Sequence, residues 1–160
     1  MSAPEPERVL AIDPALRKTG YAIVEASGRE IRALTYGTIV NAPKLLPSGC
    51  LVAIREQLND VIRQYQPTVC AIEATIFVQS LKTAIVLGSA RGAAMIAAAE
   101  HGLAIYEYAP REVKQASVGR GAAAKEQVAF MIRSMLRLKE TPPADAADAL
   151  AVAIAHFQSS

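Results

Sequence analysis

The sequence predicts an α/β fold in which helices flank one mixed sheet of five strands. Two observations indicate this class. Three strand-like segments follow one another at the start of the chain, and helix-like and strand-like segments alternate after them. Consecutive strands joined by tight turns favour an antiparallel meander, whereas strands joined through helices favour parallel pairing. With 160 residues, of which 52% are hydrophobic, we expect a single domain over residues 1–160.

The first three segments are short and rich in β-branched and aromatic residues, as strands are. They cover residues 8–13, 20–26 and 31–40, and residues 1–7 before them are expected to be flexible. Ser27-Gly28-Arg29 is typical of a hairpin turn between the second and third strands. The antiparallel pairing of these three strands follows from the short connections.

The rest of the chain alternates between helix and strand patterns. A loop over residues 41–49 precedes a helix that ends at about Tyr65, because Leu51, Ile54, Leu58, Val61 and Ile62 form one stripe and Pro67 follows. We then expect a strand over 68–73, a helix from about Ser80 to Glu100 and a strand over 103–107. A polar, basic loop over 110–121, a helix over 123–138, a turn at 141–143 and a helix over 144–157 complete the chain.

The helix over 80–100 contains a group of small residues: Gly88, Ser89, Ala90, Gly92, Ala93 and Ala94. Small residues allow a second element to approach closely. Both a subunit interface and close packing against the sheet would use them. From these residues alone, packing against the sheet is favoured.

Composition narrows the classes of function. The first eight residues lack the features of a secretory signal, and no apolar run approaches the ~18 residues of a membrane span, so we expect a cytoplasmic protein without membrane contact. Cys50 and Cys70 lack the spacing of a zinc site or a disulfide framework. Between Lys82 and Lys139, nine Lys or Arg and four Glu give a net charge of +5, which leaves −3 elsewhere. This distribution fits a polyanionic substrate, and solvated helix faces explain it equally well.

Two apolar strand patterns each end on a carboxylate. Asp13 follows Val9–Ile12, and Glu73 follows residues 68–72. A charge beside an apolar core is costly unless a positive group balances it. Asp13 precedes a proline and could simply form a turn. Glu73 is harder to explain structurally, because glutamate has poor strand propensity. A functional role is therefore favoured for Glu73.

Asp145 and Asp148 stand three residues apart at the start of the last helix, so they share one face. Acids in a first turn also interact favourably with the helix dipole, which is the structural alternative. Residues 149–155 after them are apolar all round, which indicates a buried helix. If the three segments converge, four carboxylates surround one point and form a divalent-metal site.

Other catalytic patterns are missing from the sequence. There is no Gly-x-Ser-x-Gly, phosphate-binding glycine loop or dinucleotide fingerprint. His101 and His156 fall at predicted helix ends, where we expect structural or solvated roles. Two-metal phosphodiester hydrolysis is the chemistry that four acids beside a basic segment favour.

The order of elements matches a ribonuclease-H-like arrangement, in which the first strand is central and the fourth lies beside it. Six motifs narrow this: Ala-Ile-Asp13-Pro with Thr19-Gly20-Tyr21, Ala-Ile-Glu73, Leu-Gly88-x-Ala-Arg91-Gly92, Tyr108-Ala-x-x-x-Val-Lys114-Gln115, Val-Gly119-x-Gly121 with Lys125, and Ala-Asp145-Ala-Ala-Asp148-Ala-Leu-Ala. With these motifs in this order, the chain resembles the RuvC family of Holliday-junction resolvases from Val9 to His156.

The resemblance implies a homodimeric, metal-dependent endonuclease that resolves four-way DNA junctions by paired symmetric nicks in recombination and repair. Asp13, Glu73, Asp145 and Asp148 fall on the family's four catalytic, metal-binding acids. They would hold two Mg²⁺ ions, and Mn²⁺ is expected to substitute. The resemblance also implies a branch-migration motor complex as partner, and a bacterial cytoplasm, at the nucleoid, as location.

The resemblance further implies the DNA contacts. Lys114 and Lys125 match lysines of the family's basic loop, and Arg111, Arg120 and Lys82 are added as basic neighbours. The family's wedge aromatic, third after the glutamate, is Ile76 here, with Phe77 next, so either could meet the bases. On the family pattern, the helix beginning near Ser80 lies at the dimer interface, which reverses the preference stated above.

Three departures from the family pattern motivate a second hypothesis. Ala15 replaces a glycine after the Asp-Pro pair, Ile76 stands where the family commonly has an aromatic, and Pro47-Ser48-Gly49-Cys50-Leu51 replaces a Pro-Ser-Arg-Leu loop. The alternative function is a non-cleaving junction-binding protein of the same fold. A third hypothesis, an actin-like sugar kinase or ATPase, shares the strand-then-aspartate opening, but such enzymes normally need two domains of this kind.

Overall fold

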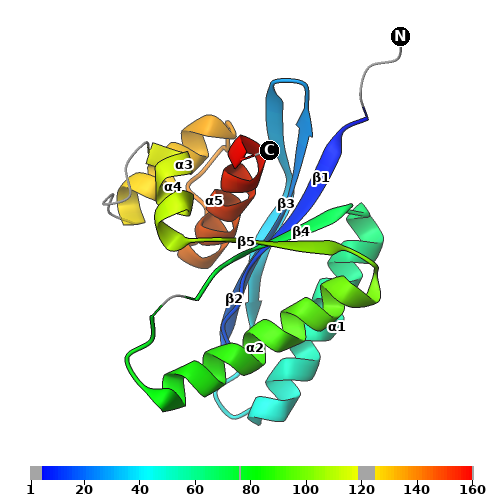
Figure 1. Cartoon of the computed structure of the whole chain (residues 1–160), viewed down its shortest axis with the longest axis vertical. Helices are drawn as coiled ribbons and strands as arrows, with labels where there is room; N and C mark the ends of the chain where they lie inside the picture. Colours follow the sequence, from blue (N-terminus) through cyan, green and yellow to red (C-terminus); the bar gives the residue numbers. More distant parts are fainter. Residues whose placement is uncertain (1–4, 76, 119–124, 160) are drawn as a thin grey trace.

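The computed structural model describes residues 5–75, 77–118 and 125–159. Its centre is a five-stranded sheet with the order β3-β2-β1-β4-β5 (Figure 1). The strands are β1 (Glu7–Asp13), β2 (Lys18–Ser27), β3 (Glu30–Val40), β4 (Val69–Glu73) and β5 (Ala104–Tyr108). β1, β2 and β3 pair antiparallel, and β1, β4 and β5 pair parallel. The predicted mixed sheet with a central first strand is therefore confirmed.

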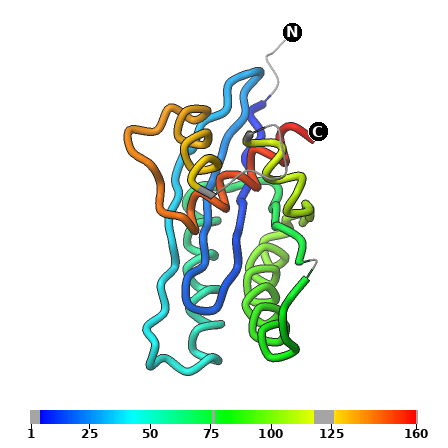
Figure 2. The backbone as a smooth tube through the Cα atoms, turned by 90° about the vertical axis from the view of Figure 1, so that its left-hand side faces the viewer, coloured from blue at the N-terminus to red at the C-terminus, as the bar shows by residue number. Residues whose placement is uncertain are grey.

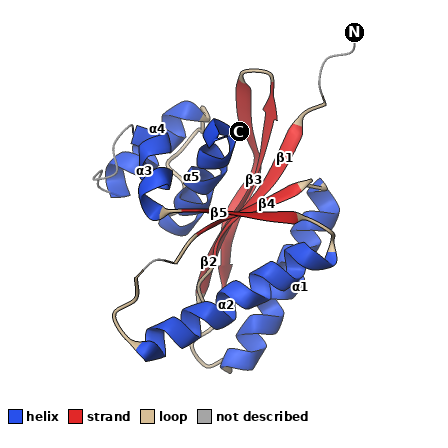
Figure 3. Cartoon of the chain, viewed as in Figure 1, coloured by secondary structure: helices blue, strands red, loops and turns tan. Residues whose placement is uncertain are grey.

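The helices cover both faces of this sheet (Figure 3). They are α1 (Pro47–Tyr65), α2 (Leu81–Glu100), α3 (Pro110–Val118), α4 (Lys125–Met135) and α5 (Ala144–Ser159). Leu10 and Ile12 of β1 face α1 and α2, whereas Val9 and Ala11 face α3, α4 and α5. This split follows from the alternation of side chains along a strand, and it gives two apolar cores, one on each face.

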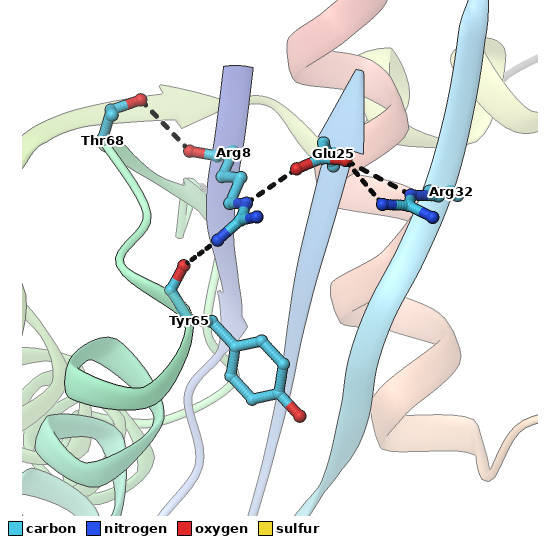
Figure 4. A network of polar contacts seen from close by, with 5 residues as sticks. All are labelled: Arg8, Glu25, Arg32, Tyr65 and Thr68. Carbon is cyan, nitrogen blue, oxygen red and sulfur yellow. Dashed lines mark hydrogen bonds and ion pairs between the residues drawn. The ribbon is translucent and has the colours of Figure 1, made fainter. Parts of the chain in front are cut away.

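The β2–β3 hairpin runs the length of the molecule (Figure 2). Its turn has Gly28 in a left-handed conformation, with φ of 62°. At the end of β1 remote from Asp13, the buried Glu25 of β2 pairs with Arg8 Nε at 2.7 Å and with Arg32 Nη2 at 3.0 Å (Figure 4). Arg8 Nη1 donates a hydrogen bond to the carbonyl of Tyr65 at 2.7 Å, which ties α1 to the sheet.

α5 lies along the sheet in the direction opposite to β1. Near its end, His156 is buried and contacts two strands. Its Nε2 lies 2.9 Å from Oε1 of Glu7, the first residue of β1, and its Nδ1 lies 2.7 Å from the hydroxyl of Tyr108, the last residue of β5. The structural role expected for His156 is therefore confirmed, and the first strand takes in Glu7, which the sequence analysis places in the flexible start.

α1 begins earlier than the sequence analysis predicts. Its first residue is Pro47, which lies within the predicted loop over 41–49. Proline suits the first helical position, because its fixed φ matches the helix and its missing N–H has no helical partner there. The departure at residues 47–51 therefore lies in the first turns of a helix.

The prediction of a loop over residues 110–121 is wrong for its first part. Residues 110–118 form α3, with Pro110 at its start and Glu112 in its first turn. Val113 and Ser117, four residues apart, are buried, at 4% exposure each. Because Ser117 is itself polar, the buried positions form no apolar stripe that the sequence pattern could reveal. Residues 119–124 lie outside the described part of the chain, and a single domain over 1–160 stays a prediction.

α2 is long and apolar enough, by length and composition, to cross a membrane, which the sequence analysis did not expect. An 18-residue window of this helix has a mean hydropathy of 1.3, and 28% of that window is buried within the chain. A single helix of this kind is weak support for a membrane span, because core helices pass the same test. Five alanines of α2 are buried, Ala90, Ala93, Ala94, Ala97 and Ala98, and they belong to the core beneath the sheet.

Candidate active site

Asp13 and Glu73 end two neighbouring parallel strands. Ile12 of β1 and Ile72 of β4 are register partners, so the two acids follow the same rung of the sheet. Ala11 and Ala71 belong to the core on the α5 side. Because alternate residues share a face, the side chains of Asp13 and Glu73 also point toward the α5 side. The predicted adjacency of the two strand-end acids is confirmed.

Gly20 allows the start of α5 to approach these strands. It is the register partner of Asp13 on β2. A Cβ at Gly20 would lie 1.9 Å from the carbonyl oxygen of Asp145 and 3.2 Å from the backbone nitrogen of Ala146. No side chain fits there, so glycine is required for this contact. The contact brings Asp145, and Asp148 one turn later, to the strand that neighbours Asp13.

One cavity of about 360 Å³ brings the predicted acids together. Asp13, Glu73, Asp145 and Asp148 all line it, and so does Lys114 of α3. The remaining lining residues are Pro110, Val113, Val128 and Ala151. A polar patch of four carboxylates and one ammonium group thus lies on an apolar wall, where charge interactions are stronger than in water.

The donor set of this cavity suits a hard divalent cation, because Mg²⁺ prefers carboxylate oxygens. Within the described residues, no three Asp, Glu, His or Cys side chains are gathered closely enough to hold an ion as they stand. Carboxylates at short range repel one another, which favours a spread arrangement until cations balance their charge. Asp13, Glu73 and Asp148 each also make an interaction within the chain.

A second cavity, of about 460 Å³, opens beside the first and shares Asp13, Glu73 and Pro110 with it. Phe77 and Arg111, two of the predicted DNA-contacting residues, line it. Phe77 is 83% exposed. Lys82 is exposed on the first turn of α2 and lines neither cavity. Ile76, Arg120 and the side chain of Lys125 lie outside the described residues.

The turn after Asp13 is held by Thr19. The hydroxyl of Thr19 is fully buried, donates to the carbonyl of Ala15 at 2.6 Å and accepts from its N–H at 3.2 Å. Among the described non-glycine residues, positive φ occurs at Gln66 and Arg137, so Ala15 has an ordinary backbone conformation. The replacement of glycine by Ala15 therefore leaves this turn unstrained.

Sequence reasoning missed a role for Arg91, although the residue belongs to a quoted motif. Arg91 of α2 lines the larger cavity, and its Nη1 donates to the carbonyl of Glu73 at 2.8 Å. Burial raises the pKa of the nearby Cys70 thiol to about 12, although the Arg91 charge acts in the opposite direction. The sequence does contain a signal that points to Arg91, because Arg91 is the only charged residue between positions 83 and 99.

Comparison with known proteins assigns the family. The profile described as crossover junction endodeoxyribonuclease RuvC matches residues 9–156. A crossover junction endodeoxyribonuclease RuvC of Akkermansia muciniphila is 54% identical over 153 residues, which cover 96% of this chain and 92% of that protein. The chain belongs to the RuvC family.

Solved structures agree with this assignment. A Thermus thermophilus RuvC in complex with a Holliday junction substrate matches with a TM-score of 0.88 and 36% identity, over 94% of this chain and 93% of that one. The yeast mitochondrial Holliday junction resolvase Ydc2 matches with a TM-score of 0.66 over 93% of this chain and 77% of that one. At 12% identity, Ydc2 supports the fold alone. The RuvC and ribonuclease-H-like predictions are confirmed.

Proposed function

We propose that this RuvC-family chain resolves four-way DNA junctions by hydrolysing phosphodiester bonds in two opposed strands. The observation that carries the proposal is the shared cavity: acids from β1, β4 and α5 line it together with Lys114. Four carboxylates from three segments give the charge needed to bind divalent cations where a DNA phosphate can reach them.

Asp13, Glu73, Asp145 and Asp148 are the residues that would hold the ions, proposed as two Mg²⁺ with Mn²⁺ as a substitute. When bound, such ions supply Lewis-acid activation of a water and charge neutralisation at the leaving oxygen. The chain itself supplies the fixed geometry. β1 and β4 hold two donors at the same rung of neighbouring strands, and α5 presents the other two from the side.

Lys114 is the cation best placed for the substrate, since it lines the same cavity as the acids. Its ammonium group would bind the scissile phosphate and offset the negative charge that grows in the transition state. Arg111 and Phe77 line the adjoining cavity, so they would contact the DNA next to the cut. Lys125 and Ile76 are proposed as further DNA contacts from the family pattern, and Lys82 and Arg120 from their charge.

We further propose that a second copy of the chain packs on α2. Three of its large apolar side chains are exposed: Leu81 by 78%, Ile85 by 63% and Ile96 by 53%. Added Cβ atoms at Gly88 and Gly92 would meet nothing within 4 Å, which leaves room for a close neighbour. A symmetric pair would carry two active sites, one for each of the two strands that are cut.

We also propose that the protein acts in the bacterial cytoplasm, at the nucleoid. A branch-migration motor complex is proposed as its partner there.

The test is cutting of a synthetic four-way junction by D145N. We expect loss of cutting with junction binding largely intact, because the amide keeps the shape of the aspartate and removes its charge. D60N, which changes an exposed aspartate of α1, is the matched control and should cut normally. Wild-type cutting by D145N would contradict the proposal. If the wild-type chain binds the junction but forms no product at any Mg²⁺ or Mn²⁺ concentration, the alternative of a non-cleaving junction-binding protein is favoured.

A further inference from the structure

Arg91 reaches the active site from the opposite face of the sheet. It belongs to α2, which packs on the face covered by α1, whereas the four acids point to the face covered by α5. Its side chain is 15% exposed. A nearly buried guanidinium needs partners for its donors, because an unpaired buried charge is costly. Its partners lie at the carboxyl ends of β4 and β5.

Two contacts fix the position of the guanidinium. Nη1 donates to the backbone carbonyl of Glu73 at 2.8 Å, and Nη2 pairs with the carboxylate of Glu107. Glu107 of β5 is the register partner of Ile72, the residue before Glu73. Arg91 therefore joins α2 to two neighbouring strands, at Glu73 of β4 and one rung earlier at Glu107 of β5. A planar guanidinium can make both contacts at once, which a lysine ammonium does less well.

The main chain leaves the sheet directly after Glu73, which is paired with Tyr108 of β5. Glu73 is the last residue of β4, and α2 begins eight positions later at Leu81. The N–H of Ala74 donates to the carbonyl of Tyr108 at 2.7 Å, and beyond it the chain leaves the sheet. The direction of a metal-binding side chain at the end of a strand depends on how firmly the backbone of that residue is held. The Arg91 contact supplies that support at the carbonyl of Glu73 itself.

Two effects of Arg91 on a bound cation oppose each other. Arg91 lines a cavity with Asp13 and Glu73, so its positive charge repels a divalent ion there. Its contact with the Glu73 carbonyl favours the ion, because a fixed donor loses less conformational freedom on binding. Whether Arg91 weakens or strengthens cation binding overall can be measured, and the result shows which of the two effects is larger.

We propose that Arg91, held in place by Glu107, is a positioning residue that orients Glu73 for divalent ions. The inference rests on the proposed function, since it assigns a support to one of the four acids of that site. Arg91 acts through the backbone of Glu73 and the substrate need not touch it. The role explains why the one charge within residues 83–99 of an otherwise small and apolar helix segment is aimed at a strand end.

The experiment measures binding of Mn²⁺ alone to the full chain, without DNA, by the loss of the free Mn²⁺ signal in electron paramagnetic resonance. The variants are R91Q, R91K and E107Q. R55Q is the matched control, because the exposed Arg55 pairs with Glu100 of α2 at 2.6 Å and lines neither cavity. Junction cutting as a function of Mg²⁺ concentration is measured in parallel.

We expect R91Q to weaken Mn²⁺ binding about tenfold, as loss of a residue that supports a metal ligand typically does. R91K keeps the charge and should still bind Mn²⁺ more weakly than the wild type. E107Q should also weaken Mn²⁺ binding, by a smaller factor. The Mg²⁺ concentration for half-maximal cutting should rise in the same order, and R55Q should match the wild type in both assays.

Three results would overturn the inference: unchanged or tighter Mn²⁺ binding by R91Q, wild-type behaviour of R91K, or an equal loss in R55Q. Circular dichroism establishes which variants are folded, and if R91Q is not, R91K and E107Q decide the outcome. A wild-type chain that neither binds Mn²⁺ nor cuts junctions would overturn the proposed function and this inference with it. Wild-type binding and cutting with an unaffected R91Q would overturn the role of Arg91 alone.

Discussion

The carbonyl oxygen of Asp145 lies 1.9 Å from the place that a Cβ on Gly20 would occupy. Gly20 is paired with Asp13 across the β1–β2 ladder, so this contact sets the spacing between a strand acid and the helix acids. The position of α5 over the sheet thus depends on one missing methyl group.

G20A should displace α5 and abolish cutting, because a Cβ that meets backbone atoms cannot be relieved by a side-chain rotation. We expect a loss of about 1–3 kcal/mol in the free energy of unfolding, measured in urea. G28A is the control: Gly28 has φ of 62° with open space around it, so alanine there should cost about 1 kcal/mol and leave cutting intact. Full activity of G20A would contradict the proposed dependence on this contact.

K114M should slow cutting about 100-fold, the typical cost of losing one group that stabilises transition-state charge. Mn²⁺ binding should be no weaker than in the wild type, since the variant removes a positive charge and no donor from the cavity. Single-turnover cutting and Mn²⁺ binding measure the two effects. K44M, on an exposed loop, should be wild-type in both. If K114M lost metal binding and cutting together, Lys114 would be a structural support.

I85D should convert the proposed dimer to a monomer and lower the yield of paired cuts, because a carboxylate would be buried against the second copy. Sedimentation velocity measures the oligomeric state. V52D provides the comparison, since Val52 is a 52% exposed apolar residue on α1. A wild-type chain that sediments as a monomer at working concentrations, or a dimer of I85D, would contradict the α2 interface.

F77A should weaken junction cutting by the loss of a base contact, worth about 1–3 kcal/mol for stacking. Its stability should be unchanged, because the side chain is 83% exposed. Cutting rates on junctions and thermal unfolding are the measurements. F130A removes another exposed phenylalanine, on α4, and should change neither. Equal cutting by F77A and the wild type would leave Ile76 as the candidate base contact.

Stability should fall with acid through Glu25. Hydrogen bonds from Arg8, then from Arg32, hold the pKa of this carboxyl below its ordinary value of 4.5, although burial opposes them. A depressed pKa in the folded state stabilises the fold above the unfolded pKa, and this contribution disappears as pH falls through the folded pKa. Urea unfolding of the wild type and E25Q should therefore differ most at pH 6–7 and converge below pH 4.5. A constant difference across this range would be inconsistent with the shift.

The four acids could be predicted from the sequence because each stands at an element end that the hydrophobic pattern defines. Asp13 and Glu73 follow apolar runs, and a central first strand makes them neighbours. α3 could not be predicted in the same way. Among its described side chains Val113 and Ser117 are buried, and because Ser117 is polar they form no apolar stripe.

Specific contacts between elements could not be predicted from sequence patterns. The role of Gly20 depends on how closely α5 approaches β2, and that of Arg91 depends on a carbonyl presented by a strand from another layer. Both residues stand in family motifs, Gly20 in Thr19-Gly20-Tyr21 and Arg91 in Leu-Gly88-x-Ala-Arg91-Gly92. Periodicity reports which face of an element is apolar, and it carries no information on which backbone atom a side chain will meet.

α5 is fastened to the sheet at both ends, at its start by the Gly20 contact and near its end by His156 with Glu7 and Tyr108. The strand of Asp13 and the helix of Asp145 and Asp148 are therefore held together by contacts at two separate places. Glu73 comes from the neighbouring strand and is steadied from another layer. We therefore expect ion binding to change amide exchange at Glu73 and Ala74 and to leave amide exchange in α5 constant.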